Sequence, residues 1–213
     1  FRNGLTKMGS STVETIFWDF DGVLMDSNEI RDRGFELVLA DFPDHEIEQL
    51  LSFHQANGGL SRYVKFRYFF EEVRGEESVT DERIQHWADR FSEIMLQHLK
   101  DSGLLIDETV SFVRREHENF NMHVVSGSDG KELREICSSV GIASYFKSIH
   151  GSPTPKTEHV GRLIKKHQYH TDTAILIGDS INDHEAAENN NISFMGYGNS
   201  SIEEVGKNKI KIQ

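Results

Sequence analysis

The sequence is short of cysteine, basic residues and long apolar runs, and each shortage argues against a class of protein. Its one cysteine, Cys137, rules out an internal disulfide and is typical of a reducing compartment. No run approaches the roughly 20 apolar residues that a membrane-spanning helix needs. The 35 acidic residues outnumber the 23 basic ones and give a net charge of -12, which argues against a general nucleic-acid binder. We therefore expect neither a membrane nor a nucleic acid as partner.

The amino-terminal segment also lacks a targeting signal. Residues 1–10 contain no apolar core of the kind that a secretory signal carries, so we expect a cytoplasmic protein. The sequence leaves open whether these residues are native, and it leaves the oligomeric state open as well.

What is present is an apolar strand followed by a long helical block. A strand is predicted at residues 16–18, and 213 residues suffice for one core and a modest second domain. Apolar residues at helical spacing then predict helices near 29–40, 44–56, 61–73 and 80–99. Nothing between residues 28 and 101 has the pattern of a strand. This block therefore resembles an inserted helical domain.

From residue 104 the pattern alternates between helices and short apolar strands. Helices are predicted near 108–119 and 131–140, from 156, and between 183 and 192. Strands are predicted at 122–125, 148–149, 173–177 and 192–195. Buried strands that alternate with helices indicate a parallel sheet covered on both faces. The predicted fold class is α/β, a Rossmann-like parallel sheet with an inserted helical domain. The core would comprise residues 1–26 and 102–213, and the helical domain residues 27–101.

Two carboxylates stand where the first strand ends. Asp19 and Asp21 are separated by one residue and followed by Gly22, which lets the backbone turn. Residues two apart on an extended segment share a face, so these carboxylates would repel each other unless a divalent cation lay between them. A solvated strand end is the plainer alternative for this pair taken alone.

Further polar residues follow other predicted strands. Ser126, Asp179 and Asp183 stand at strand ends, and the carboxyl ends of parallel strands are where such sheets bind ligands. Together with Lys156 and the first two aspartates, they suit phosphoryl transfer. Asp179 and Asp183 would join Asp19 around Mg²⁺, a hard cation that prefers oxygen ligands.

Each residue type suits one step of that chemistry. Asp19 could attack phosphorus and form an aspartyl-phosphate, while Asp21 protonates the leaving oxygen and later deprotonates water. Ser126 and the amides after it, beginning with Gly127, can donate hydrogen bonds to phosphate oxygens. Lys156 adds a fixed positive charge, with Lys131 and Lys147 as less suitable substitutes.

On these residues the sequence resembles the haloacid dehalogenase superfamily. The four motifs of its phosphatases stand here as D-F-D-G-V at 19–23, Ser126, Lys156 and G-D-S-I-N-D at 178–183. The resemblance implies that Asp19 is nucleophile and metal ligand, that Asp21 is acid and base and offers its backbone carbonyl to the metal, and that Asp179 is the third ligand. It places Asp183 behind the ligands and makes the helical block a cap.

The resemblance also narrows the reaction. An aspartate at position 21 favours hydrolysis of a phosphate ester, or a phosphomutase, over dehalogenation. The leading prediction is a magnesium-dependent phosphatase of a small phosphorylated metabolite, similar to phosphoglycolate or sugar-phosphate phosphatases. A phosphomutase on the same residues and a non-catalytic binding protein are the alternatives.

Substrate choice is expected to depend on the helical block. Residues 57–66 combine a glycine turn with a helix start, an arrangement that suits anion binding. Gly59, Arg62 and Lys65 are the candidate substrate residues there, with the two cations one turn apart. The alternative is that both cations are solvated charges on a helix surface.

Overall fold

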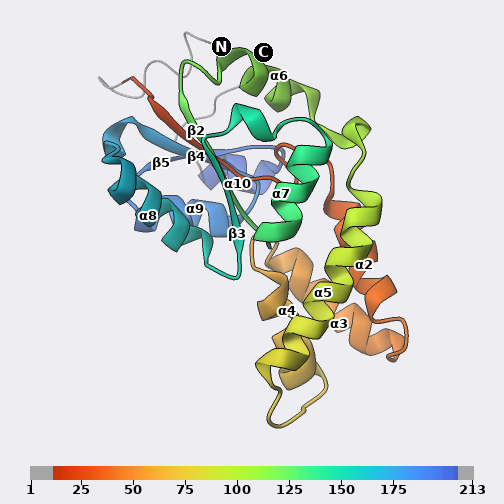
Figure 1. Ribbon diagram of the computed structural model, residues 1–213. Helices are drawn as coiled ribbons and strands as arrows, with labels where there is room; N and C mark the ends of the chain where they lie inside the picture. Colours follow the sequence, from red (N-terminus) through yellow and green to blue (C-terminus); the bar gives the residue numbers. More distant parts are fainter. Residues whose placement is uncertain (1–11, 206–213) are drawn as a thin grey trace.

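The computed structural model describes residues 12–205, which form a five-stranded sheet and a helical insertion after its first strand (Figure 1). The strand order is β3-β2-β1-β4-β5, and all four pairings are parallel. The predicted α/β class is therefore confirmed. The strands are β1 (Thr15–Trp18), β2 (Asn121–Asp129), β3 (Ser148–Ser152), β4 (Ala174–Gly178) and β5 (Ser193–Gly196).

Alternate residues of β1 enter the two layers that cover the sheet. Ile16 and Trp18 belong to the apolar cluster that includes residues of α6 and α7, whereas Phe17 belongs to the cluster with residues of α8 and α9. Figure 1 shows these helix pairs on opposite sides of the sheet. Their bounds are α6 (Asp107–Glu116), α7 (Gly130–Ser139), α8 (Lys156–His167) and α9 (Ile181–Asn189), and α10 (Ser200–Val205) follows β5.

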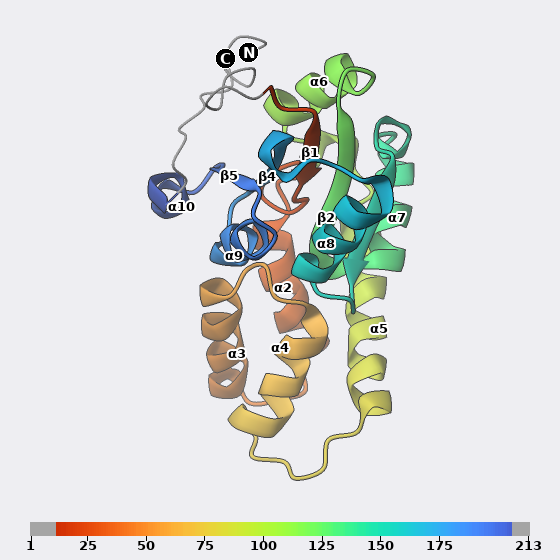
Figure 2. The same cartoon turned by 90° about the vertical axis from the view of Figure 1, so that its left-hand side faces the viewer.

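The helical insertion spans residues 28–98 and lies beyond the carboxyl ends of the strands (Figure 2). An aromatic cluster fills its interior, with Phe35 and Phe91 ring centroids 4.4 Å apart and Phe66 against both. This cluster is continuous with the core of the sheet. The elements are α2 (Asn28–Val38), α3 (Asp44–Ala56), α4 (Arg62–Tyr68), a π-helical turn (Phe69–Val73) and α5 (Asp81–His98).

The structure differs from the predicted elements in the third helix, in strands β2 and β3, and near the carboxyl end of the described residues, and β3 continues from its predicted end at Ile149 to Ser152. The predicted third helix is α-helical only to Tyr68 and ends in the π-helical turn. β2 continues beyond its predicted end at Val125, because after a register shift Asp129 still pairs with Ser152 of β3. Helix α10 was not predicted. The domain limits, with a core of residues 1–26 and 102–213 and a helical domain of residues 27–101, stay a prediction. Residues 1–11 and 206–213 of the predicted core lie outside the described residues.

Short 3-10 turns complete the chain at Ser102–Leu104, Ala143–Tyr145 and Thr171–Thr173. Within residues 12–205, no helix combines the length and the apolar composition that crossing a membrane requires.

Two histidines, the buried His123 of β2 and the half-buried His150 of β3, make the stability depend on pH. Burial, with nearby His167, lowers the pKa of His123 to about 3, and burial, with nearby His159, lowers that of His150 to about 4. Both rings accept or donate hydrogen bonds at Ser148 Oγ, each over 2.7 Å. The folded protein therefore resists protonation of both rings.

We expect the free energy of unfolding to decrease as the pH falls from about 6.5 towards 4. In that window the two histidines bind protons in the unfolded chain but not in the folded one. Their contribution to stability is therefore fully present above the histidine pKa of the unfolded chain and is lost as the pH falls below it. His123→Asn keeps a nitrogen near Ser148 and should reduce the slope of stability against pH by about one proton, or roughly 1.4 kcal/mol per pH unit. Urea unfolding between pH 4.5 and 6 measures this slope, and an unchanged slope would contradict the assignment.

Candidate active site

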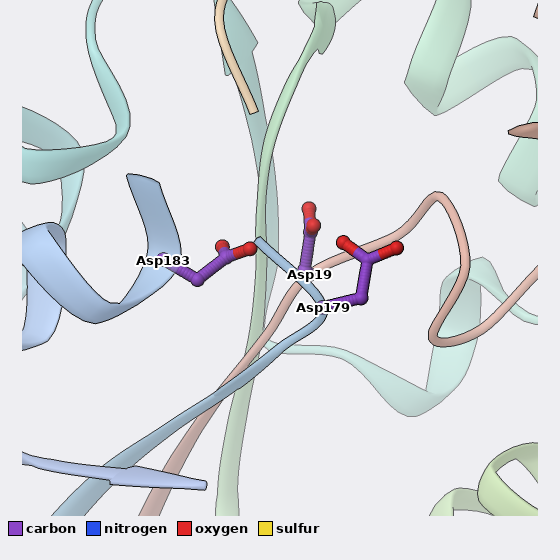
Figure 3. A group of neighbouring side chains, drawn as sticks. All are labelled: Asp19, Asp179 and Asp183. Carbon is purple, nitrogen blue, oxygen red and sulfur yellow. The ribbon is translucent and has the colours of Figure 1, made fainter. Parts of the chain in front are cut away.

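Three carboxylates gather at the carboxyl ends of β1 and β4. Asp19 follows β1, Asp179 follows β4, and Asp183 lies in the first turn of α9. One carboxylate oxygen from each lies within 4.8 Å of the others, and Figure 3 shows the Asp183 side chain directed towards Asp19. Asp19 and Asp183 are buried and Asp179 is half-buried. Such a set of hard oxygen donors fits Mg²⁺.

The electrostatics of this group call for a cation. Burial and the charge of Asp183 raise the pKa of Asp19 well above its ordinary value, and the same two causes raise that of Asp179 to about 6. Lys156, at the start of α8, supplies part of the missing positive charge. Its Nζ lies 2.8 Å from Asp19 Oδ1 and also contacts Asp183 Oδ1. The repulsion that remains is what a bound divalent cation would remove.

Two glycines allow the carboxylates to come this close. A Cβ at Gly22 would lie 2.1 Å from Asp179 Oδ2, and the residue has a φ of +72°, which other residues rarely adopt. A Cβ at Gly178 would lie 2.2 Å from Asp183 Cγ. Any side chain at either position would therefore displace a member of the carboxylate group.

Asp21 has an environment of its own. Its carboxylate accepts hydrogen bonds from Ser27 Oγ over 2.5 Å, Arg31 Nε over 2.5 Å and Ser128 Oγ over 2.6 Å. Burial alone would raise the pKa of Asp21, but Arg31 and the two hydroxyls outweigh it and hold the pKa below its ordinary value. Its side chain is not in the group of three, so a contribution to the metal through its backbone carbonyl stays a prediction.

A chain of buried ion pairs leads from Asp21 into the insertion. Arg31 of α2 uses Nη1 to bind Glu132 Oε1 of α7 over 3.0 Å. Glu132 Oε2 forms a second ion pair with Arg62 Nη1 of α4, over 2.5 Å. Arg62 also donates to Ser92 Oγ over 2.7 Å and stacks on the ring of Phe91. Both arginines and Glu132 are buried.

The insertion and the sheet together line a cavity of about 350 Å³ at this edge. Its walls meet closely at two glycines, because a Cβ at Gly127 would lie 2.4 Å from the backbone oxygen of Gly59. Tyr63 OH of α4 donates to Asp129 Oδ2, at the start of α7, over 2.8 Å. The predicted site residues that line the cavity are Asp19, Asp21, Gly59, Arg62, Lys65, Ser126, Gly127 and Asp179.

The other predicted residues, Lys156 and Asp183, lie behind Asp19 rather than on the cavity wall. Sequence reasoning missed Arg31, Ser128 and Glu132. Ser128 lies two residues after Ser126 and could have been found from the alternation of a strand. Arg31 and Glu132 are 101 positions apart, and no local pattern indicates that they meet.

Sequence comparison agrees with this geometry. The sequence model of the family described as haloacid dehalogenase-like hydrolases matches residues 16–197, which include all the site residues named above. The chain belongs to the haloacid dehalogenase-like hydrolases. The resemblance drawn from the motifs is thereby confirmed at the level of the superfamily.

Individual relatives cover most of the chain. A 5'-nucleotidase from Pseudomonas aeruginosa is 26% identical over 188 residues, which are 86% of this chain and 81% of that protein. Among solved structures, the hydrolase YfnB from Bacillus subtilis bound to magnesium has a TM-score of 0.63, 15% identity and 86% coverage of each chain. CbbY from Rhodobacter sphaeroides, in complex with xylulose-1,5-bisphosphate, has a TM-score of 0.68, 15% identity and 89% coverage of each. At such identities these structures show a common fold.

Proposed function

We propose that this hydrolase is a magnesium-dependent phosphatase of a small phosphorylated metabolite. The observation that carries the proposal is a group of three carboxylates, two of them buried, with Asp19 facing a cavity and Lys156 behind it. A solvated strand end would not need buried acids at such close range. The proposal names a sugar phosphate or a phosphoglycolate-like compound as the substrate class.

In the first half of the reaction, an oxygen of Asp19 attacks phosphorus. A bond forms between that oxygen and phosphorus, and the ester bond breaks. Asp21 is ionised in the free protein, because Arg31 and two hydroxyls lower its pKa, so it first takes a proton from the phosphate monoanion of the substrate and then passes it to the leaving oxygen. In the second half, water attacks the aspartyl-phosphate, Asp21 takes up a proton from the water, and inorganic phosphate leaves. Proton transfer in both halves therefore depends on Asp21, the carboxylate that lies outside the group of three.

Other groups of the chain hold and neutralise the phosphoryl group. Ser126 lines the cavity beside Asp19 and can donate to a phosphoryl oxygen, as can the amide of Gly127. Lys156 keeps its proton, because the charges of Asp183 and Asp19 raise its pKa despite burial. A Mg²⁺ ion bound to Asp19 and Asp179, with the backbone carbonyl of Asp21 as a further ligand, would supply positive charge against the incoming phosphate.

The size of the cavity favours a small substrate. Its volume of about 350 Å³ is near the lower end of the roughly 300 to 1,000 Å³ usual for ligand pockets. We assign the helical insertion the role of a cap that excludes water and contacts the leaving group. Gly59 of the cap and Gly127 of the core are then positions at which the two backbones approach closely.

A phosphomutase is the second candidate function and would use the same residues. It is favoured by the structural neighbour CbbY, which was solved with a sugar bisphosphate. The two reactions differ in what accepts the phosphoryl group from Asp19. In a phosphatase the acceptor is water. In a mutase it is a hydroxyl of the sugar phosphate that the cap retains.

A substrate panel tests the proposal. Purified protein is incubated with sugar phosphates, phosphoglycolate and nucleoside 5'-monophosphates, with Mg²⁺ or with EDTA, and free phosphate is measured. We expect release that requires Mg²⁺ and is fastest for the small esters. Isomerisation without release of phosphate would favour the mutase, and no turnover of any compound would favour a binding protein.

A further inference from the structure

Lys65 is a buried cation without an ion-pair partner among the described residues. It is 3% exposed and lines the cavity, and its Nζ donates to the backbone oxygen of Gly58 over 3.2 Å. Burial lowers its pKa to about 7, with Arg31 and Arg62 adding to the effect and Asp21 opposing it. Since burying an unpaired charge costs free energy, an anionic partner in the cavity would stabilise the ammonium form of Lys65.

Arg31 also lines the cavity and has a donor without a partner within residues 12–205. This residue is 6% exposed, and its Nε and Nη1 are used by Asp21 and Glu132. Its Nη2 is buried and has no hydrogen-bond partner in the described part of the chain. A buried guanidinium nitrogen rarely goes without an acceptor, so this atom also indicates a group that the protein itself does not provide.

Arg62, one turn before Lys65, is already neutralised. Its Nη1 binds both Glu132 Oε2 and Ser92 Oγ, and its guanidinium stacks on Phe91. The predicted pair of substrate cations, Arg62 and Lys65, is therefore divided between two roles. Arg62 and Glu132 hold the cavity wall together, and Glu132 also orients Arg31.

We propose that Arg31 Nη2 and Lys65 Nζ form a subsite for a second acidic group, a carboxylate or a phosphate, on the leaving group of the substrate. This inference rests on the proposed phosphatase function and narrows its substrate class. The subsite lies on the side of Asp21, which both Arg31 and Lys65 influence electrostatically and which protonates the leaving oxygen. The leaving group is thus held from the side at which it departs.

The balance of charges distinguishes an acidic group from a neutral one. Asp21 and Glu132 pair with Arg31 and Arg62, and Asp32, a further carboxylate on the cavity wall, is bound by His54 and Gln55. Among the described residues no carboxylate forms an ion pair with Lys65, and Asp32 acts on it only as a nearby charge. A hydroxyl could accept hydrogen bonds from both free donors but would leave the charge of Lys65 buried. An acidic oxygen group satisfies the donors and the charge together.

Two matched substrate pairs test this subsite. In 3-phosphoglycerate a carboxylate replaces the terminal hydroxymethyl group of glycerol 3-phosphate, and glucose 1,6-bisphosphate carries a second phosphate that glucose 1-phosphate lacks. We expect kcat/KM of the wild type to be at least about tenfold higher for the acidic member of one pair, equivalent to about 1.4 kcal/mol. The pair that shows the preference identifies the acidic group as carboxylate or phosphate.

Lys65→Met should reduce this preference at least about tenfold, because it removes the charge and keeps most of the apolar stem. Arg90→Met is the matched control, since Arg90 lies on Trp87 of the insertion and does not line the cavity. Thermal unfolding establishes whether each variant folds. If Lys65→Met fails to fold, the ratios of kcat/KM measured with the wild type still test the subsite.

The outcomes separate the two proposals. Magnesium-dependent hydrolysis with ratios near one in both wild-type pairs would overturn the subsite and leave the phosphatase standing. The same follows if a folded Lys65→Met variant keeps the full preference. Failure to release phosphate from any of the four compounds, together with failure on the wider panel, would instead count against the phosphatase.

Discussion

Replacing Asp19 with asparagine is expected to abolish magnesium-dependent phosphate release, with a loss of roughly 10⁴-fold or more. An amide is a poor nucleophile for phosphorus, and it also removes one of the three carboxylates that would hold the metal. The measurement is kcat with p-nitrophenyl phosphate and with the best substrate of the panel, at saturating Mg²⁺.

The same substitution should leave the fold intact. Burial and the charge of Asp183 disfavour the ionised form of Asp19, so a neutral side chain removes repulsion, and Lys156 keeps its contact with Asp183. We expect the Tm without Mg²⁺ to be unchanged or raised, as is common where activity requires a strained site. The increase in Tm on adding Mg²⁺ should become smaller than in the wild type.

Asp26→Asn is the matched control, because Asp26 is an exposed aspartate of the same loop that does not line the cavity. It should retain full turnover and the full increase in Tm with Mg²⁺. Substantial turnover by a folded Asp19→Asn variant would show that another group attacks phosphorus.

Local patterns were enough to predict the fold and the residues that gather at the sheet edge. The alternation of helices and apolar strands implies a parallel sheet, and parallel strands end at a common edge. Asp19 and Asp179 could therefore be placed together from sequence, since each directly follows an apolar strand. Neither prediction needs knowledge of side chains that are distant in sequence.

The environment of Asp21 could not be predicted in this way. Its partner Arg31 and the next member of the chain, Glu132, come from helices α2 and α7, which meet only after the insertion has packed on the sheet. Helical spacing indicated which cations share a face of α4, but a carboxylate of α7 decides that Arg62 is neutralised and Lys65 is not. Charge pairing across elements is a property of tertiary structure.

This paired environment makes Asp21→Asn the second variant with a large expected effect. Asparagine has one acceptor oxygen, which can keep the hydrogen bond from Ser27, and an NH2 group that can donate to Ser128 Oγ instead of accepting from it. It can neither donate a proton to the leaving oxygen nor take one from water. Loss of general acid and base catalysis typically costs about 10² to 10⁴ in rate. We expect a loss of that size for alkyl phosphates, whose leaving oxygen needs a proton.

The leaving group provides the control for Asp21. A p-nitrophenolate leaves without a proton, so formation of the aspartyl-phosphate from p-nitrophenyl phosphate should be far less sensitive to Asp21→Asn than formation from an alkyl phosphate. Rapid-quench measurement of the phosphorylated protein separates this step from the attack of water, which also needs Asp21. Equal losses for both substrates in the first step would mean that Asp21 acts by orienting Arg31 and the cavity wall. A selective loss for the alkyl ester requires proton transfer from Asp21, because the two esters meet the same Arg31, Ser27 and Ser128 and differ in their need for a proton.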